Sequence, residues 1–187
     1  MSDKIKIEIQ LEFTPNPNTL KYVLNRQILL IGTENYTSKR EADEFSPLAS
    51  KLFGIKNVKG VMIGSNFISL TITSHDNLRD LNKEVMETIK GHLELGEPIC
   101  IPRAEETIRG EDNETASRIR EIINQEIRPA VAMDGGDITF ERLEENVVYL
   151  HMVGACSGCP SSSMTLKMGI QNRIQQEFPE ISDVVPL

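Results

Sequence analysis

Two of the three cysteines in the chain lie three positions apart, in the stretch VGACSGCPSSSMTLKMG, and a proline follows the second one. Cys156 and Cys159 are soft thiol donors, suited to zinc, iron–sulfur clusters or redox chemistry. Zinc and iron–sulfur clusters normally take four protein ligands, so one pair supplies half of a site. A two-fold dimer would bring two pairs together, and we therefore predict a four-thiolate site shared between two chains.

The residues around the pair indicate a strand-to-helix turn. Proline is favoured at the first position of a helix, so Pro160 predicts that a helix begins there, with Cys159 near its N-cap. The positive end of a helix stabilises negative charge, which favours thiolate over thiol. Gly154 and Gly158 leave room for backbone amides to approach a bound cluster. We expect an exposed cysteine pair that stabilises an anion.

Few other side chains qualify as ligands. His151 lies on the preceding strand, where neighbouring side chains alternate between faces, and we predict that it is not a ligand. Cys100 falls in a linker and is expected to be a bystander thiol. The stretch DGGD, residues 134–137, holds two glycines that permit positive φ, so we predict a turn that packs beside the cysteine loop. Four methionines are expected to fill the core: Met133, Met152, Met164 and Met168.

The first part of the chain has the pattern of a small α+β domain, predicted at residues 1–98. Strands are expected at KIKIEIQLEF, where apolar and polar residues alternate, and at LKYVLN, with a turn at TPNPNT between them. One helix is expected in READEFSPLASKLFGI and ends at Gly54. Two strands then meet at the GSN turn of VKGVMIGSNFISLTIT, and a longer amphipathic helix runs to Gly96.

Residues 99–113 lose this periodicity, carry charge, proline and glycine, and are predicted to form a linker. Residues 114–187 predict a second domain of the order α-β-β-α-β. Its parts are an amphipathic helix closed by Pro129, a hairpin with its turn at LEEN, the cysteine loop, a helix from Pro160 to about Glu177, and a short terminal strand. The predicted fold class is therefore two small α+β domains joined by a linker.

Charge and hydropathy exclude several classes of partner. The 20 basic residues stand against 28 acidic ones, for a net charge of −8, without a dense cluster of lysine and arginine. We therefore expect no nucleic acid partner. Apolar runs fall short of the roughly 18 residues that a membrane helix requires, so we expect no membrane partner. The low cysteine content suits a reducing compartment, and the opening MSDKIKIEIQ is unlike a signal peptide, which predicts a cytoplasmic protein.

The stretches RPAVAMDGGDI and GACSGCPSSSMTLKMGIQNRI closely resemble the NifU-like C-terminal domain of Nfu-type iron–sulfur proteins. EFTPNPNTLKYVLN resembles the N-terminal domain that precedes it in many members, so the resemblance covers nearly the whole chain. It implies a scaffold or carrier that binds a [4Fe-4S] cluster between the CxxC motifs of two protomers, with Cys156 and Cys159 as the ligands here. Mitochondrial members carry a transit peptide that this sequence lacks. That difference favours a bacterial-type cytoplasmic protein or a mature form in the mitochondrial matrix.

The same resemblance implies the partners. They are apo iron–sulfur proteins as acceptors, an upstream cluster-assembly scaffold as donor, and a second copy of the chain in a homodimer on cluster binding. The N-terminal domain, which has no cysteine before the linker, would recognise partners or regulate delivery. Transfer would proceed by ligand exchange, so we expect a protein that is not an enzyme and has no catalytic constellation.

Two alternatives stay open at this point. A thioredoxin-like redox centre also places CxxC at a helix N-terminus, but the preceding hairpin replaces the βαβ pattern expected there, and too few residues follow Cys159. A structural zinc shared by two chains suits four thiolates as well as a cluster does. The residues alone do not reject zinc.

Overall fold

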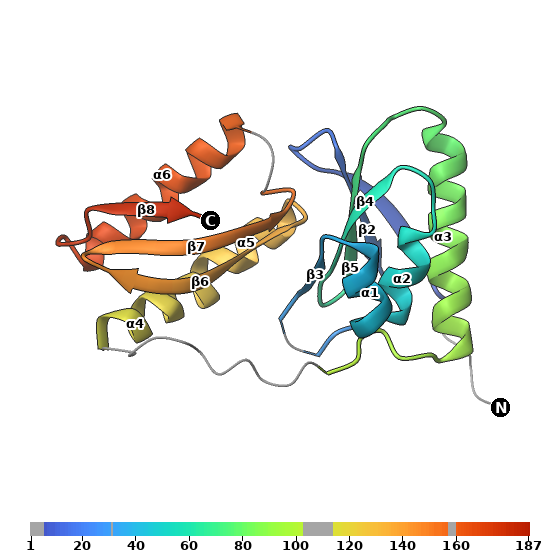
Figure 1. The fold of residues 1–187 in the computed structure, drawn as a ribbon, viewed down its shortest axis with the longest axis horizontal. Helices are drawn as coiled ribbons and strands as arrows, with labels where there is room; N and C mark the ends of the chain where they lie inside the picture. Colours follow the sequence, from blue (N-terminus) through green and yellow to red (C-terminus); the bar gives the residue numbers. More distant parts are fainter. Residues whose placement is uncertain (1–5, 31, 103–113, 157–159) are drawn as a thin grey trace. The chain divides into compact units, whose positions relative to one another are not determined.

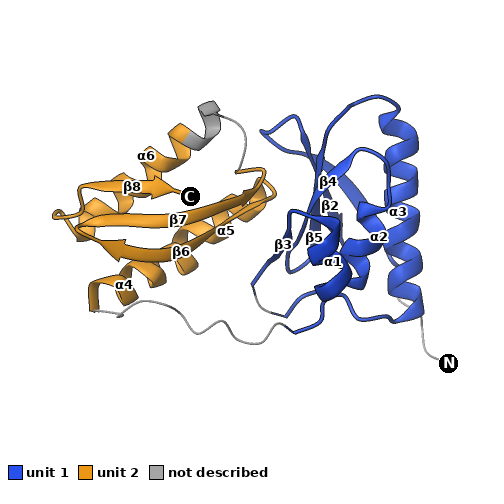
Figure 2. Cartoon of the chain, in the orientation of Figure 1, with its two compact units in different colours: residues 1–103 blue, residues 104–187 orange. Residues whose placement is uncertain are grey.

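The computed structural model describes residues 6–30, 32–102, 114–156 and 160–187, except the side chains of residues 160–163. The chain divides into two compact units, unit 1 at residues 1–103 and unit 2 at residues 104–187 (Figure 2). Each unit combines a sheet with helices (Figure 1), which confirms the predicted α+β fold class. Most of the predicted linker, residues 99–113, lies outside the described residues.

Unit 1 is built on an antiparallel sheet with the strand order β1-β2-β5-β4-β3. The strands are β1 (Ile9–Phe13), β2 (Thr19–Leu24), β3 (Glu34–Tyr36), β4 (Val58–Ile63) and β5 (Phe67–Ile72). All except β3 were predicted, although β1 begins only at Ile9. The predicted turn between β1 and β2 is present, and in it the carbonyl of Asn16 accepts a hydrogen bond of 3.0 Å from the Thr19 amide. β3 escaped prediction because three residues are too few to show an alternation.

The helices of unit 1 differ from the prediction at one place. They are α1 (Lys39–Phe45), α2 (Pro47–Phe53) and α3 (Leu78–Leu95). The prediction of a single helix in place of α1 and α2 was wrong. Ser46 has an extended backbone, and its hydroxyl caps α2 by accepting a hydrogen bond of 3.0 Å from the Ala49 amide. Pro47 has no amide hydrogen with which α1 could continue. Gly54 ends α2 and Gly96, with a φ of 69°, ends α3, as predicted.

Side chains on one face of the unit 1 sheet pack against the helices. Tyr22 and Leu70 from the sheet contribute to one buried cluster with Leu52 of α2 and Ile89 of α3, and all four are fully buried. Burying each of these side chains stabilises the fold by about 2 kcal/mol. The apolar face of each element is therefore what holds unit 1 together.

The chain that leaves α3 stays attached to unit 1. The hydroxyl of Ser46 donates a hydrogen bond of 2.6 Å to the carbonyl of Ile99, and the amide of Ile101 donates one of 2.7 Å to the carbonyl of Phe45. Cys100 lies between these two contacts, partly buried against the core of unit 1. The first residues of the predicted linker are thus held by hydrogen bonds.

Unit 2 follows the predicted order α-β-β-α-β. Its elements are α4 (Glu114–Ile122), the π-helical turn η1 (Ile123–Ile127), α5 (Arg128–Met133), β6 (Gly136–Glu144), β7 (Val147–Gly154), α6 (Pro160–Glu177) and β8 (Asp183–Pro186). α6 begins and ends at the predicted residues. The strand order is β6-β7-β8, and β8 runs parallel to β7, with Val184 opposite Val148.

The first helical segment of unit 2 does not end at Pro129, and that prediction was wrong. Proline lacks the amide hydrogen of the regular helical ladder, and its ring clashes with the preceding turn. Here the π-helical turn η1 comes directly before it, and Pro129 stands among the first residues of α5. The helix therefore continues past the proline to Met133, at the edge of the predicted DGGD turn.

The β6–β7 hairpin carries the core of unit 2 on one face. Its turn residues, Glu145 and Asn146, have φ values of 48° and 63°, as in the type I′ turns that suit the twist of paired strands. Ile138 and Leu150 from the hairpin pack with Ile174 of α6 in one buried cluster. This packing fixes the hairpin against the helices. None of the helices in the described part of the chain has the length and apolar character that a membrane crossing needs.

Candidate metal centre

The β6–β7 hairpin brings the two loops of the site together. β6 begins at Gly136 and β7 ends at Gly154, and the pairing register places these residues opposite each other. The amide of Ala155 donates a hydrogen bond of 3.1 Å to the carbonyl of Gly135. The turn predicted at DGGD is confirmed at Asp134 and Gly135, with a φ of 76° at Gly135. This turn lies directly beside the residues that lead into the cysteine loop, as the sequence predicted.

Cys156 is buried, with 6% of its surface exposed, so the prediction of an exposed cysteine pair was wrong for this residue. Its sulfur packs against Gly136 in the space that a side chain would otherwise fill. A Cβ added to Gly136 would overlap the Cys156 sulfur and lie 2.9 Å from the Cys156 amide nitrogen. Gly136 stands in β6 without a positive φ, so the glycine is needed here for space and not for its backbone freedom.

The surroundings of Cys156 favour the thiol. Burial raises the pKa of Cys156 to about 12, and the carboxylates of Asp134 and Asp137 add to the rise. A metal bound by this sulfur must therefore displace a proton. The helix end that was predicted to favour a thiolate concerns Cys159, and both Cys159 and Gly158 lie outside the described residues.

A buried ion pair next to the site was missed in the sequence. Both carboxylate oxygens of Asp137 accept hydrogen bonds from Arg128, at 2.8 Å from Nε and 2.6 Å from Nη2, and the Asp137 side chain is 2% exposed. Arg128 also donates a hydrogen bond of 3.1 Å to Asn124 Oδ1. The signal available in the sequence was an aspartate at the start of an apolar strand, a position that requires a partner when it is buried.

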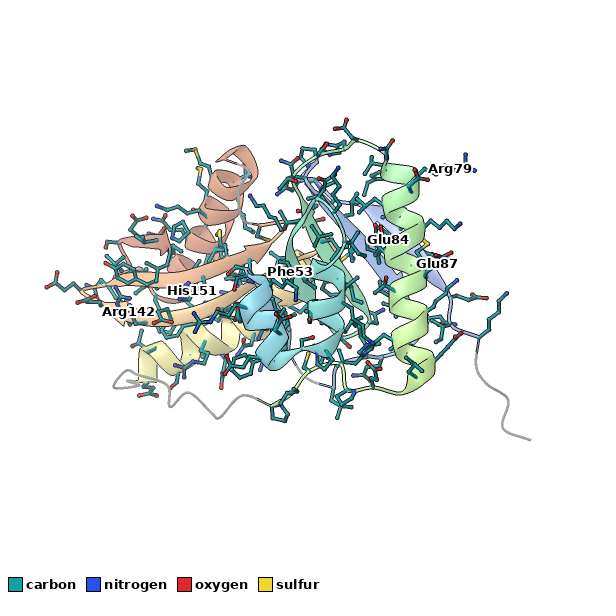
Figure 3. The ribbon with its side chains drawn as sticks, turned by 45° about the vertical axis from the view of Figure 1, so that its right-hand side comes forward. Phe53, Arg79, Glu84, Glu87, Arg142 and His151 are labelled. Carbon is teal, nitrogen blue, oxygen red and sulfur yellow. The ribbon has the colours of Figure 1, made fainter. Side chains whose placement is uncertain are left out.

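The other candidate ligands lie elsewhere. Figure 3 shows His151 and Arg142 on the hairpin of unit 2, and His151 Nε2 lies 3.3 Å from Glu141 Oε2. That His151 is not a ligand stays a prediction. Cys100 belongs to unit 1, where it packs, partly buried, against the core. Among the described residues, no three histidine, cysteine, aspartate or glutamate side chains are grouped so that they could hold a metal ion.

The methionines differ from the prediction. Met152 is buried in the core of unit 2, but Met133, Met164 and Met168 are 75%, 66% and 59% exposed. The prediction that these methionines fill the core was therefore wrong for three of the four. On α6 the buried stripe runs through Ile170, and Met168 lies two residues, or about 200°, away around the helix.

The donor that the structure describes is one soft sulfur at the end of a strand. Thiolate sulfur suits zinc and iron–sulfur clusters, and neither is completed by one described sulfur. Cys159, three residues further on in the sequence, would supply a second sulfur of the same kind. The chemistry open to such a sulfur is reversible metal–thiolate bonding, which needs further ligands beyond the one described here.

Comparison with known proteins matches both units. The family model described as "NifU-like domain" matches residues 119–185, and the one described as "Scaffold protein Nfu/NifU N terminal" matches residues 9–96. A solution NMR structure of a NifU-like protein from Saccharomyces cerevisiae covers 55% of this chain and 92% of its own, with a TM-score of 0.48 and 21% identity.

Two curated relatives share the description "NFU1 iron-sulfur cluster scaffold homolog, mitochondrial". The Drosophila grimshawi protein is 38% identical over 179 residues, which cover 94% of this chain and 60% of that protein. The human protein is 38% identical over 184 residues, which cover 94% of this chain and 70% of that protein. The chain thus spans less than two thirds of the first relative and somewhat more than two thirds of the second. From these matches and the two family matches, the chain belongs to the family of Nfu-type iron–sulfur cluster scaffold proteins.

Proposed function

We propose that this protein carries iron–sulfur clusters: it binds a [4Fe-4S] cluster between Cys156 and Cys159 of two protomers and transfers it to apo-proteins. The cluster is cargo and not a resident cofactor. The observation that carries the proposal is the position of Cys156, a soft sulfur donor in the turn directly after β7, within the residues that match the NifU-like domain. Membership of a scaffold family supports the cluster as the cargo.

The shortage of ligands supports the shared site. Both zinc and iron–sulfur clusters need about four protein ligands, and CxxC supplies a pair. A second copy related by a two-fold axis supplies the missing pair with the same geometry. Met164 and Met168 are exposed one turn apart on α6, the helix that follows the cysteine loop, and they offer an apolar surface to that second copy.

Transfer is proposed to occur by ligand exchange. Acceptor thiolates replace the carrier sulfurs one at a time, and each released carrier sulfur takes up a proton. The acceptors are apo iron–sulfur proteins, and the donor is an upstream assembly scaffold. No enzymatic step is needed in this scheme. Unit 1, in which Cys100 is the one cysteine, is proposed to recognise partners.

The test is anaerobic reconstitution of the full chain with iron and sulfide. We expect about four irons per two chains, as a cluster of this type requires, a Mössbauer spectrum of [4Fe-4S], and a dimer by size-exclusion chromatography. Cys156→Ser and Cys159→Ser should each lose the cluster. Cys100→Ser, the matched control in unit 1, should keep it.

Other outcomes would identify the alternatives. Stoichiometric zinc that iron does not displace, in protein purified without oxygen, would replace the proposal by a structural zinc site. A colourless monomer that reduces insulin disulfides would indicate a redox centre instead. Both relatives are named as mitochondrial proteins, which supports the matrix over the cytoplasm as the compartment; the cytoplasmic location stays a prediction.

A further inference from the structure

The sulfur of Cys156 lies in a buried position at the start of β6. We call this the thiol seat and define it by Gly136 and the backbone of residues 155–156. One wall is the bare Cα of Gly136, where an added Cβ would overlap the sulfur and lie 3.1 Å from the Cys156 Cβ. The hydrogen bond from the Ala155 amide to the Gly135 carbonyl, 3.1 Å long, joins the two sides.

Asp137, the residue after Gly136, is bound by a side chain from another element. Asp137 is held through both carboxylate oxygens by the guanidinium of Arg128, at the start of α5. A two-point bond between charged groups restricts orientation as well as distance. The Arg128 side chain is itself 24% exposed, so the pair lies mostly away from water. The position of Gly136 relative to α5 is fixed by this contact.

Arg128 is in turn oriented by the helix before it. Its Nη1 donates to Asn124 Oδ1 at 3.1 Å, and Asn124 belongs to the π-helical turn η1. The irregular turn that accommodates Pro129 therefore also supplies a second anchor for the guanidinium. A continuous set of contacts runs from η1 through Arg128 and Asp137 to the wall of the thiol seat.

We propose that Arg128, acting through Asp137, is a positioning residue for Cys156: it holds Gly136 against the sulfur and shelters this thiol in the cluster-free chain. The inference rests on the proposed function where it treats Cys156 as a cluster ligand. The sheltering is a property of the chain without metal. In this proposal the sulfur becomes available to a cluster when the seat opens, so the stability of the contacts around the seat sets how readily Cys156 acts as a ligand.

The test measures thiol reactivity without iron. In a Cys159→Ser background, Cys100 and Cys156 are the remaining cysteines, and iodoacetamide labelling of each is followed by peptide mass spectrometry. Arg128→Gln should raise the labelling rate of Cys156 relative to Cys100 by about tenfold, because the seat opens more often. Arg128→Lys, which keeps the charge but loses the two-point geometry, should fall between Arg128→Gln and the parent.

If Arg128 only stabilised unit 2 as a whole, the Cys156 labelling rate would depend on urea in a different way. Ile174→Ala removes a fully buried side chain of α6 that is no part of the Arg128–Asp137 pair. Its Cys156 labelling should therefore occur through global unfolding and rise steeply with sub-denaturing urea. In Arg128→Gln the added labelling should be nearly independent of urea, as expected for a local opening. If the Cys156 labelling rate of Arg128→Gln rose with urea as steeply as that of Ile174→Ala, the proposal would be overturned. An unchanged labelling rate in both Arg128 variants would also overturn it.

A second pair of variants tests the seat itself. Gly136→Ala places a methyl group in the sulfur's position and should raise Cys156 labelling at least as much as Arg128→Gln. Gly169→Ala is the matched control, since an added Cβ there meets nothing within 4 Å, and it should label like the parent. Equal Cys156 labelling in Gly136→Ala and Gly169→Ala would overturn the proposal. Since no cluster is involved, these results are independent of whether reconstitution succeeds.

Discussion

His92 Nε2 donates a hydrogen bond of 3.1 Å to the carbonyl oxygen of Pro98, and this ties the end of α3 to the chain that leaves unit 1. His92 is buried, with 1% of its surface exposed. With Nε2 as the donor, Nδ1 is left to accept from Lys51 Nζ at 3.3 Å, and Glu97 Oε2 lies 3.3 Å from the same nitrogen. The neutral ring therefore fits this site.

The first prediction is that unit 1 loses stability as the pH falls below 6.5, the ordinary pKa of histidine. Burial is the largest cause that lowers the pKa of His92 in the folded protein, and the charge of Lys51 is the second. The hydrogen bond to Pro98 and the charge of Glu97 raise this pKa, but by less. The unfolded chain then binds the proton first, so the free energy of unfolding decreases from pH 6.5 down to the folded pKa. Urea unfolding from about pH 7.5 to about pH 5.5 should show this slope.

The control for this prediction is a second histidine of unit 1. His92→Gln should remove most of the slope, whereas His75→Gln, on an exposed residue, should retain it. An unchanged slope in His92→Gln would assign the pH dependence to other groups.

The second prediction separates buried from exposed positions on α6. Ile174→Ala removes a fully buried side chain and should destabilise unit 2 by about 2–5 kcal/mol. Met168→Ala should stay within about 0.5 kcal/mol of the parent, because Met168 is largely exposed. Hydrogen exchange followed by mass spectrometry reports each unit separately. Unit 1 peptides should be unaffected by both changes, and a loss of protection there would contradict two separate cores.

The spacing of apolar residues was sufficient to predict the regular helices and strands, but it failed where the backbone is irregular. α3 is long and keeps an apolar stripe through Val85 and Ile89, so the helix and its end at Gly96 were predicted correctly. The break at Ser46 and the continuation past Pro129 depend on a single hydroxyl cap and on a π-helical turn, which leave no periodic signal. The exposed methionines were missed because residue type alone does not say which face of α6 is covered.

The candidate site was predictable in composition and not in geometry. CxxC and the following Pro160 are local in the sequence, so the cysteine pair and the start of α6 could be predicted directly. The burial of Cys156 depends on Gly136, which lies on the other strand of the hairpin, and no spacing rule connects the two. The Arg128–Asp137 pair is likewise a contact between elements.

The third prediction concerns the hairpin turn of unit 2. Glu145 adopts a φ of 48°, which is costly for most side chains and well tolerated by asparagine. Glu145→Asn should therefore stabilise unit 2 by up to about 1 kcal/mol, seen as a higher urea midpoint. Glu145→Gln removes the charge without relieving the backbone and should stay at the parent value. An equal gain in both variants would show that charge is responsible.

The fourth prediction concerns self-association on cluster binding. Met164→Lys together with Met168→Lys places like charges on the α6 surface that we propose faces a second copy, so the reconstituted protein should form less dimer. Sedimentation velocity of the anaerobically reconstituted protein measures this fraction. Leu30→Lys, on an 88% exposed residue of unit 1, should dimerise like the parent. A dimer fraction unchanged in the double variant would place the contact elsewhere.

The layout of unit 2 also predicts an order of events during synthesis. Gly136 is the first residue of the β6–β7 hairpin and Cys156 follows its last strand, and antiparallel neighbours of this kind pair through contacts that are close in the sequence. β8 pairs with β7 in parallel only after α6 has been made, through contacts that are far apart. We expect the hairpin, and with it the shelter around Cys156, to form on the nascent chain before the last strand arrives. The thiol would then be protected from oxidants before unit 2 is complete.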